Sequence, residues 1–297
     1  MADVVFGATG MVGSYIVQHL AQRGSRVVAV SRREKEKEIE HVECITADLT
    51  KAETLVFPDT EDVYCATNPR IFAKALPNIL RYRPKRIVVI SSTSVLTKLD
   101  SRDKDERSSI RELVISEASI IRDCQFAGVE WTLLRPTLIY REGRDRNVTQ
   151  IARLVQLFRF MPLYGDGSGL RQPVHAEDLA VGAICAAKSS AAANKRYFTT
   201  GIETIPYREM VGRVFDGLSL PRRLIPLPPI VWKAAFSLAA PFYPNVTLSM
   251  GERMLTNLAF DSSAAVSDFA WNTRTFAPSF REICPVGRVG SGAGSGN

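Results

Sequence analysis

A glycine-rich turn at the start of the chain constrains the fold more than any other feature. The apolar run over residues 1–6 predicts a buried strand, GATGMVG follows as residues 7–13, and a helical pattern comes directly after it. In such a unit Gly7 permits a tight turn, Gly10 lets the backbone approach phosphates, and Gly13 lets helix and strand pack closely. The turn therefore predicts a site for a dinucleotide pyrophosphate at a helix N-terminus.

Strand and helix patterns alternate through the first half of the chain. Apolar runs with little polar alternation predict further strands at Arg26–Val30, Val42–Ile45, Val63–Ala66, Arg86–Ile90 and Trp131–Leu134. Helical patterns lie between them at Ile71–Tyr82 and Asp105–Ala127. Strands separated by helices imply right-handed crossovers and a parallel sheet whose two faces are both buried. We therefore predict an α/β fold, a Rossmann-like doubly wound parallel sheet, over residues 1–140.

The pattern becomes looser after Pro136, which indicates a second, smaller unit. Helices are expected at Asn147–Phe160, Ala176–Ala187 and Pro206–Leu218, and a short strand at Arg196–Thr199. Residues 221–229 hold four prolines and predict a loop. We assign residues 141–285 mostly to a small C-terminal substrate-binding lobe, with some elements returning to the Rossmann core. The end of the chain, residues 286–297, is rich in glycine and serine and predicts a disordered tail.

Charge and cysteine content limit the classes of partner. The 38 Lys and Arg exceed the 31 Asp and Glu, giving a net charge of +7 that is spread along the chain and accompanies no nucleic-acid module. A small anionic substrate suits this surface better than nucleic acid. The five cysteines and three histidines show no metal-ligand spacing, so we expect no metal site and a reducing cytoplasmic location.

One apolar segment near the C-terminus leaves two interpretations open. Residues Ile230–Tyr243 are almost wholly apolar but too short to span a bilayer, which takes ~20 residues. The segment fits peripheral contact with a membrane interface, which would leave the protein cytoplasmic but membrane-associated. It also fits a buried helix or an oligomer contact, such as that of a homodimer.

Four stretches together carry a family resemblance. They are the turn at residues 7–13, Asp48–Leu49 after the third strand, the serine-bearing strand end Ile90–Val95, and YGDGSGLRQPVHAEDLA at residues 164–180. In this combination the chain resembles the extended branch of the short-chain dehydrogenase/reductase superfamily, the sugar-nucleotide epimerases, dehydratases and reductases. The segments Leu134–Val148 and Phe260–Asp261 are similar to bacterial enzymes for surface-polysaccharide precursors, some of which act on polyprenyl-diphosphate-linked sugars.

The resemblance implies a nicotinamide dinucleotide cofactor, and the residues after the second strand address which one. Ser31–Arg32–Arg33 contains no acidic residue to bind the ribose hydroxyls of NAD, whereas an arginine can pair with the 2′-phosphate of NADP. We therefore favour NADP(H) over NAD(H), with Arg32 the better candidate. Alternatively, both arginines only begin the solvated charged run to Glu40. The predicted cofactor contacts are Gly7, Thr9, Gly10, Met11, Val12, Gly13, Arg32, Arg33, Asp48, Leu49 and Ala66.

The catalytic residues that the resemblance implies are only partly present. The superfamily uses a serine on the fifth strand, which Ser92 matches with Thr93 beside it, although these residues could equally cap the strand end. It also uses a tyrosine with a lysine four residues later. Counting back from Arg135 places these two positions near Ser109 and Leu113. The pair is missing, since no tyrosine lies between Tyr82 and Tyr140 and no lysine between Lys104 and Lys188.

Three explanations for the missing pair remain open. A glutamate can serve as acid or base, the candidates being Glu106, Glu112 and Glu117. A side chain can reach the site from a loop, the candidates being Lys98, Lys104 and Tyr140. In the third explanation the protein binds its cofactor without turnover.

The predicted substrate contacts are arginines and one asparagine. Arg171 resembles the family's diphosphate-binding arginine, and a guanidinium suits two-point contact with phosphate oxygens. Asn147 stands at an expected helix start, where it could cap the helix or meet a phosphate. Arg253 is a further candidate, whereas Arg141, Arg144 and Arg146 fit surface charges. His175 is expected to fix the entry of the following helix.

Two functions follow from these observations. The first is an NADP(H)-dependent oxidoreductase or epimerase acting on a sugar carried on a diphosphate, either nucleotide-linked or polyprenyl-linked. The alternative is a cofactor-binding, catalytically altered relative that serves as a sensor or scaffold.

Overall fold

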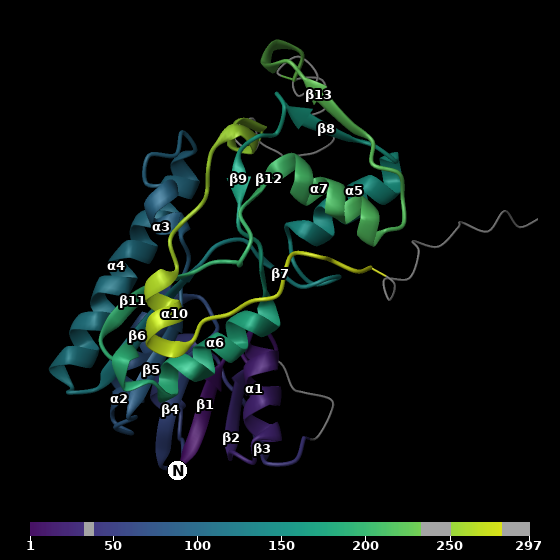
Figure 1. The fold of residues 1–297 in the computed structure, drawn as a ribbon. Helices are drawn as coiled ribbons and strands as arrows, with labels where there is room; N and C mark the ends of the chain where they lie inside the picture. Colours follow the sequence, from purple (N-terminus) through teal and green to yellow (C-terminus); the bar gives the residue numbers. More distant parts are fainter. Residues whose placement is uncertain (33–38, 233–250, 281–297) are drawn as a thin grey trace, which may run out of the picture.

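A seven-stranded sheet, parallel at every pairing, forms the base of the molecule in a computed structural model that describes residues 1–32, 39–232 and 251–280 (Figure 1). The strand order is β11-β6-β5-β4-β1-β2-β3, which reverses direction at β1 and β4. Such a reversal opens a crevice at the carboxyl ends of the strands, where open α/β sheets bind ligands. The predicted Rossmann-like doubly wound sheet is confirmed. The strands are β1 Ala2–Phe6, β2 Val27–Ser31, β3 Val42–Thr46, β4 Thr60–Cys65, β5 Arg86–Ile90, β6 Glu130–Pro136 and β11 Lys195–Thr199.

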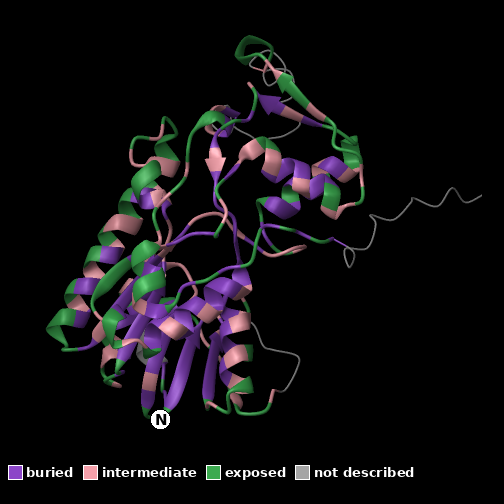
Figure 2. Ribbon diagram, viewed as in Figure 1, coloured by how far each residue is buried: buried purple, intermediate pink, exposed green. Residues whose placement is uncertain are grey.

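Helices cover both faces of this sheet because successive residues of the buried strands point to opposite faces. On one face Val5, Tyr64 and Val88 pack with α1 (Gly13–Gln22) and α6 (Ala176–Lys188). On the other face Phe6, Val63 and Val89 pack with α2 (Pro69–Leu80) and α4 (Lys104–Phe126). Figure 2 shows the consequence, with the central strands buried and the outer sides of the helices exposed. The edge strands β3 and β11 are partly exposed.

A smaller lobe lies beyond the carboxyl ends of the strands (Figure 1). Its core joins α5 (Val148–Phe158) and α7 (Tyr207–Gly217) around Met210, Phe215 and Phe276. Three two-stranded ribbons belong to this region: β7 Ile139–Tyr140 with β10 Val174–His175, β8 Met161–Tyr164 with β13 Leu224–Leu227, and β9 Leu170–Arg171 with β12 Ile205–Pro206. The remaining elements are α3 Ser94–Thr97, α10 Ser263–Phe269 and the short 3₁₀ helices η1 Leu49–Thr54, η2 Ser190–Ala192 and η3 Arg253–Leu255.

The proline-rich segment was predicted wrongly as a loop. Within it, β13 forms a parallel ribbon with β8, with Pro226 opposite Leu163. A two-stranded ribbon consists only of edge strands, which tolerate proline because only one side of the backbone needs a donor.

Several sequence predictions fall partly or wholly on residues outside the described ranges. These are Arg33, the apolar segment after Trp232 and the tail at residues 286–297. At the start of the apolar segment Ile230 and Val231 are exposed. Within the described ranges, none of the helices has the length and apolar character needed to cross a bilayer.

Candidate functional site

The turn after β1 is built so that only glycine fits at its key positions. Gly7 has a φ of +78°, and a Cβ on it would lie 2.7 Å from the Ala66 carbonyl oxygen. A Cβ on Gly13 would overlap the carbonyl oxygen of Gly7, which already accepts a hydrogen bond from the Gly10 N–H at 2.8 Å. Close packing of this backbone therefore requires the glycines that the sequence places there.

The N-terminus of α1 faces this turn without a cap. Val12 is the N-cap residue, and its side chain makes no capping hydrogen bond. The N–H groups of Ser14, Tyr15 and Ile16 donate to backbone carbonyls of Gly10 and Val12. The partial positive charge of the helix N-terminus still favours an anion beside it. A dinucleotide pyrophosphate is an acceptor that fits this cradle.

Arg141, expected to be a surface charge, instead contacts the turn. Its guanidinium is half-buried, donates to the Met11 carbonyl oxygen at 3.0 Å and the Ser14 Oγ at 2.6 Å, and stacks 4.2 Å above the Tyr15 ring. Burial lowers the pKa of Arg141, yet its ordinary value is high enough to leave it charged at neutral pH. A positive charge thus stands beside the helix N-terminus, brought there from 130 positions away in sequence.

The predicted ribose and adenine contacts lie along the same edge of the sheet. The Gly7 N–H donates to the Val30 carbonyl oxygen, which places the end of β2 and the exposed Arg32 next to the turn. Asp48 is also exposed, and hydrogen bonds from Thr50 hold its pKa below the usual value, with the Arg32 charge contributing. Leu49 points into the core beneath α2. The exposed Thr9 completes the predicted set.

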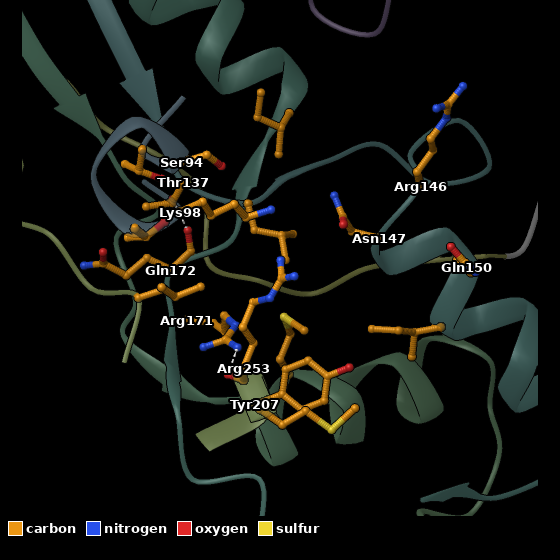
Figure 3. A pocket seen from close by; sticks show the side chains of 18 of the residues that line it. Ser94, Lys98, Thr137, Arg146, Asn147, Gln150, Arg171, Gln172, Tyr207 and Arg253 are labelled. Atoms are coloured by element: carbon orange, nitrogen blue, oxygen red, sulfur yellow. Dashed lines mark hydrogen bonds between the residues drawn. The ribbon is translucent and has the colours of Figure 1, made fainter. Parts of the chain in front are cut away.

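A cavity of about 890 Å³ adjoins the turn and extends into the lobe. Met11 lines it on the cofactor side, and Ser91 to Ser94 line it at the carboxyl end of β5. Figure 3 shows three groups around it: Ser94, Thr137 and Lys98 together, Arg171, Arg253 and Tyr207 next to them, and Arg146, Asn147 and Gln150 on the other side. The Arg253 guanidinium reaches Glu106, which also binds Lys98. Cofactor turn and lobe therefore line one continuous cavity that opens to solvent.

The two predicted catalytic side chains both line this cavity but differ in their contacts. Ser92 Oγ lies 3.0 Å from Ser94 Oγ and accepts a hydrogen bond from the Ser94 N–H. Thr93 is buried, and its hydroxyl donates to the Pro136 carbonyl oxygen at 3.1 Å. Thr93 therefore fastens the end of β5 to β6, and Ser92 is the better placed of the two to meet a ligand.

Two of the proposed substitutes for the missing tyrosine and lysine are paired in the cavity. Lys98 Nζ lies 2.7 Å from Glu106 Oε1, and both Arg253 terminal nitrogens lie 3.2 Å from the same carboxylate. Burial raises the pKa of Glu106, but hydrogen bonds from Lys98 and Ser101 together with the charges of Lys98 and Arg253 outweigh it, so the pKa is lowered. Glu106 is thus a carboxylate shared by two cations.

The other proposed substitutes do not line the cavity. Exposed Glu112 pairs with Arg70. Buried Glu117 binds Arg135 at 2.5 Å and accepts a hydrogen bond from Ser91 at 2.5 Å. Lys104 is exposed at the start of α4, and Tyr140 is packed edge-to-face against His175 and Phe276.

The predicted diphosphate-binding arginine donates its hydrogen bonds to backbone carbonyls of the protein itself. Arg171 is 5% exposed and donates to the carbonyl oxygens of Leu170 at 2.7 Å, Thr256 at 2.8 Å and Arg253 at 2.5 Å. It therefore anchors the segment that carries Arg253 while its charge remains at the cavity wall. The motif identifies an arginine there but does not reveal these backbone acceptors.

Asn147 lines the cavity and is not the cap of α5. The carboxylate of Asp145 caps the helix instead, because it accepts hydrogen bonds from the Thr149 N–H at 3.2 Å and from the Asn147 N–H at 2.7 Å. Of the alternatives for Asn147, the capping role is therefore wrong. His175 does cap a helix, since its Nδ1 accepts from the Glu177 N–H at the start of α6, as expected.

Comparisons with known proteins agree with this geometry. Residues 7–156 match a family model described as NAD(P)H-binding. The mitochondrial protein NADH dehydrogenase (ubiquinone) 1 alpha subcomplex subunit 9 of Arabidopsis thaliana is 26% identical over 273 residues. That match covers 80% of this chain but 62% of the plant protein, so the chain spans less than two thirds of that relative.

Solved structures of epimerases share the whole fold. An epimerase from Methanothermobacter thermautotrophicus superposes with a TM-score of 0.72 at 16% identity, covering 94% of this chain and 89% of that one. UDP-glucuronic acid 4-epimerase from Bacillus cereus, solved with UDP-glucuronic acid and NAD, gives 0.69 at 14% identity, covering 93% and 95%. These likenesses show that this chain has the same fold as the two epimerases.

Proposed function

Since this chain belongs to the NAD(P)H-binding family, we propose that it is an NADP(H)-dependent oxidoreductase of the epimerase type that acts on a diphosphate-linked sugar. One observation carries this proposal. A single cavity joins Met11 of the cofactor turn and Ser92 to Lys98, Arg146, Arg171 and Arg253, against one carboxylate, Glu106. The excess of positive charge favours an anionic ligand held beside the cofactor turn.

The chain's own residues have distinct roles in this proposal. The glycine turn and α1 hold the cofactor, whose nicotinamide supplies hydride chemistry when bound. Ser92 offers a hydroxyl to the reacting oxygen of the sugar. Glu106 accepts one hydrogen bond from the Lys98 ammonium group. The other N–H groups of Lys98 can then donate to a substrate oxygen. Asn147 and Arg253 contact the diphosphate.

Preference for NADP(H) is tested at Arg32. Fluorescence titration of NADPH and NADH is compared between the native protein and Arg32→Asp. Loss of a charge-assisted contact to the 2′-phosphate is expected to weaken NADPH binding by about tenfold or more, with little effect on NADH. Arg23→Asp, an exposed charge reversal at the other end of α1, is the matched control. Unchanged NADPH affinity in Arg32→Asp would refute the assignment.

Turnover is tested by following nicotinamide absorbance and sugar products with UDP-glucose and UDP-glucuronic acid, alongside a diphosphate sugar on a prenyl carrier. Lys98→Met is expected to lower kcat by about 10²-fold or more while NADPH affinity stays the same. The kcat readout separates a role in proton transfer from a role in holding the cofactor.

A second candidate, cofactor binding without turnover, is favoured by the composition of α4. The positions expected to carry the tyrosine and lysine are Ser109 and Leu113, and neither lines the cavity. The plant relative, moreover, is named as a subunit of a larger complex. Tight NADPH binding with no product from any of the three sugars would support this sensor or scaffold role over the first proposal.

A further inference from the structure

The part of the cavity away from the serines has an apolar and deformable wall. Three of the six methionines in the chain, Met161, Met210 and Met254, line the cavity from the lobe. Methionine has three rotatable side-chain bonds and a polarisable sulfur, and such surfaces adapt to flexible apolar ligands. A wall of this kind gives weak directional recognition but accommodates an apolar ligand that can bend.

Aromatic rings form the outer part of the same wall. Phe158 ends α5, and Phe160 follows it, with ring centroids 6.2 Å apart. Both rings line the cavity and yet remain 42% and 39% exposed. Trp232 also lines the cavity and packs edge-to-face against Tyr164. The apolar wall therefore continues to the protein surface.

The charged groups of the lining are Lys98, Glu106, Arg146, Arg171 and Arg253. Arg171 lies over the Tyr207 ring and directs its donors to backbone carbonyls. Lys98 and Arg253 share Glu106 near the serine end, and Arg146 is an exposed cation on the loop before α5. The cavity thus has a charged portion suited to an anionic head and an apolar portion that leads outward. A nucleotide carrier would bring the polar edges of its base against methionine and phenylalanine side chains, where unpaired polar groups are costly.

We propose that the occupant of the apolar portion is a hydrocarbon chain, so that the ligand is an amphiphile with an anionic phosphate head and a linear or isoprenoid tail. This inference rests on the proposed function only in using the same cavity, and it specifies the carrier as a lipid rather than a nucleotide. The head lies toward Lys98 and Arg253, and the tail lies along Leu154 and Phe158 toward the surface.

The first experiment titrates hexyl, octyl, decyl and dodecyl phosphate into the NADPH-loaded full-length protein by calorimetry, below their micellar concentrations. Affinity is expected to rise about fourfold per methylene until the tail fills the apolar portion. One molecule should bind per chain, with a negative heat-capacity change. UDP is expected to bind more weakly than dodecyl phosphate. Affinity independent of chain length, or binding of many molecules per chain, would overturn the proposal.

Neighbouring residues of α5 provide a matched pair of variants. Phe158→Gln removes a ring that lines the cavity, and Leu157→Gln makes a similar change at an exposed position that does not. Phe158→Gln is expected to weaken dodecyl phosphate binding by about tenfold and leave hexyl phosphate and NADPH affinity nearly unchanged. Leu157→Gln is expected to behave as the native protein. Equal effects of the two variants would overturn the proposal.

The two proposals fail in distinguishable ways. Chain-length-dependent binding with no turnover of any diphosphate sugar would remove the proposed reaction and keep the lipid ligand. Turnover of UDP-sugars together with flat alkyl phosphate affinity would keep the reaction and remove the lipid ligand.

Discussion

Asp3 is expected to destabilise the protein at neutral pH, and replacing it by asparagine should reverse this effect. Its side chain is 3% exposed in β1, and its Oδ1 has no hydrogen-bond partner within the described residues. Burial, opposed by Lys188 and reinforced by the charge of Asp62, raises the pKa of Asp3 from 3.8 to about 6. Both carboxylates lie toward the N-terminal ends of β1 and β4, whereas the cofactor turn follows the carboxyl end of β1. The Asp3→Asn substitution therefore leaves the cavity intact.

The size and sign of the effect follow from proton linkage. The folded state binds the Asp3 proton more tightly than the unfolded chain, so stability falls as pH rises from about 4 to about 6. Above that window the full difference of about 2 pKa units costs about 3 kcal/mol, and at pH 5 about half of that. Asp3→Asn should therefore raise the free energy of unfolding by about 3 kcal/mol at pH 7.5 and by about half as much at pH 5.

Urea unfolding followed by circular dichroism at the two pH values measures this difference. Asp59→Asn is the matched control, because Asp59 is exposed and its substitution should change stability by less than ~0.5 kcal/mol. The reasoning is refuted if Asp3→Asn gives no gain at pH 7.5, or gives the same gain at both pH values. A gain independent of pH would mean that the aspartate is costly for a reason other than its charge.

Two further substitutions test the turn and the buried ion pair. Gly13→Ala should lower NADPH affinity at least tenfold in fluorescence titration, because its methyl group would displace the turn carbonyl. By contrast, Gly24→Ala has open space around the new atom but a φ of +76° that strains alanine, so it should lower stability by about 1 kcal/mol and retain NADPH affinity. Glu117→Gln should destabilise the protein by about 3 kcal/mol in urea unfolding, because Arg135 loses its buried ionised partner, whereas Glu112→Gln on the exposed face should change stability by less than ~0.5 kcal/mol. A Gly13→Ala protein with native affinity, or a Glu117→Gln protein of native stability, would contradict the geometry.

The features that sequence predicted well are local ones. The glycine turn is one contiguous segment, so its identity and its backbone geometry depend on the same few residues. The strands of the central sheet can also be recognised in the sequence, because burial on both faces produces uninterrupted apolar runs. One example is the four residues that follow Arg86 in β5. The strand β13 was not predicted, because its partner β8 lies about 60 residues earlier in the sequence. Nothing in the proline-rich segment itself indicates that pairing.

The site required contacts that sequence patterns do not encode. Arg253 reaches Glu106 across 147 positions, and Arg141 reaches Met11 across 130. A motif identifies Arg171 as an arginine near a substrate but is silent on whether its donors face a ligand or backbone carbonyls. Three carbonyl acceptors make Arg171 chiefly an anchor for the segment that bears Arg253. Residue type was therefore predictable at this position, and its hydrogen-bond partners were not.

The missing tyrosine and lysine are a second case in which sequence patterns do not show which side chains meet in the cavity. On α4 the positions expected to carry the tyrosine and the lysine hold Ser109 and Leu113. Glu106 lies three residues before Ser109, hence one turn earlier on the same helix face, and there α4 does meet the cavity. Its partner Lys98 comes from the end of α3, eight residues away, so the pair spans two elements. An acid and an amine thus occupy the cavity in an arrangement that no single-helix pattern could reveal. If either group transfers a proton, removing Lys98 should change kcat while the cofactor turn, a separate structure, continues to bind NADPH.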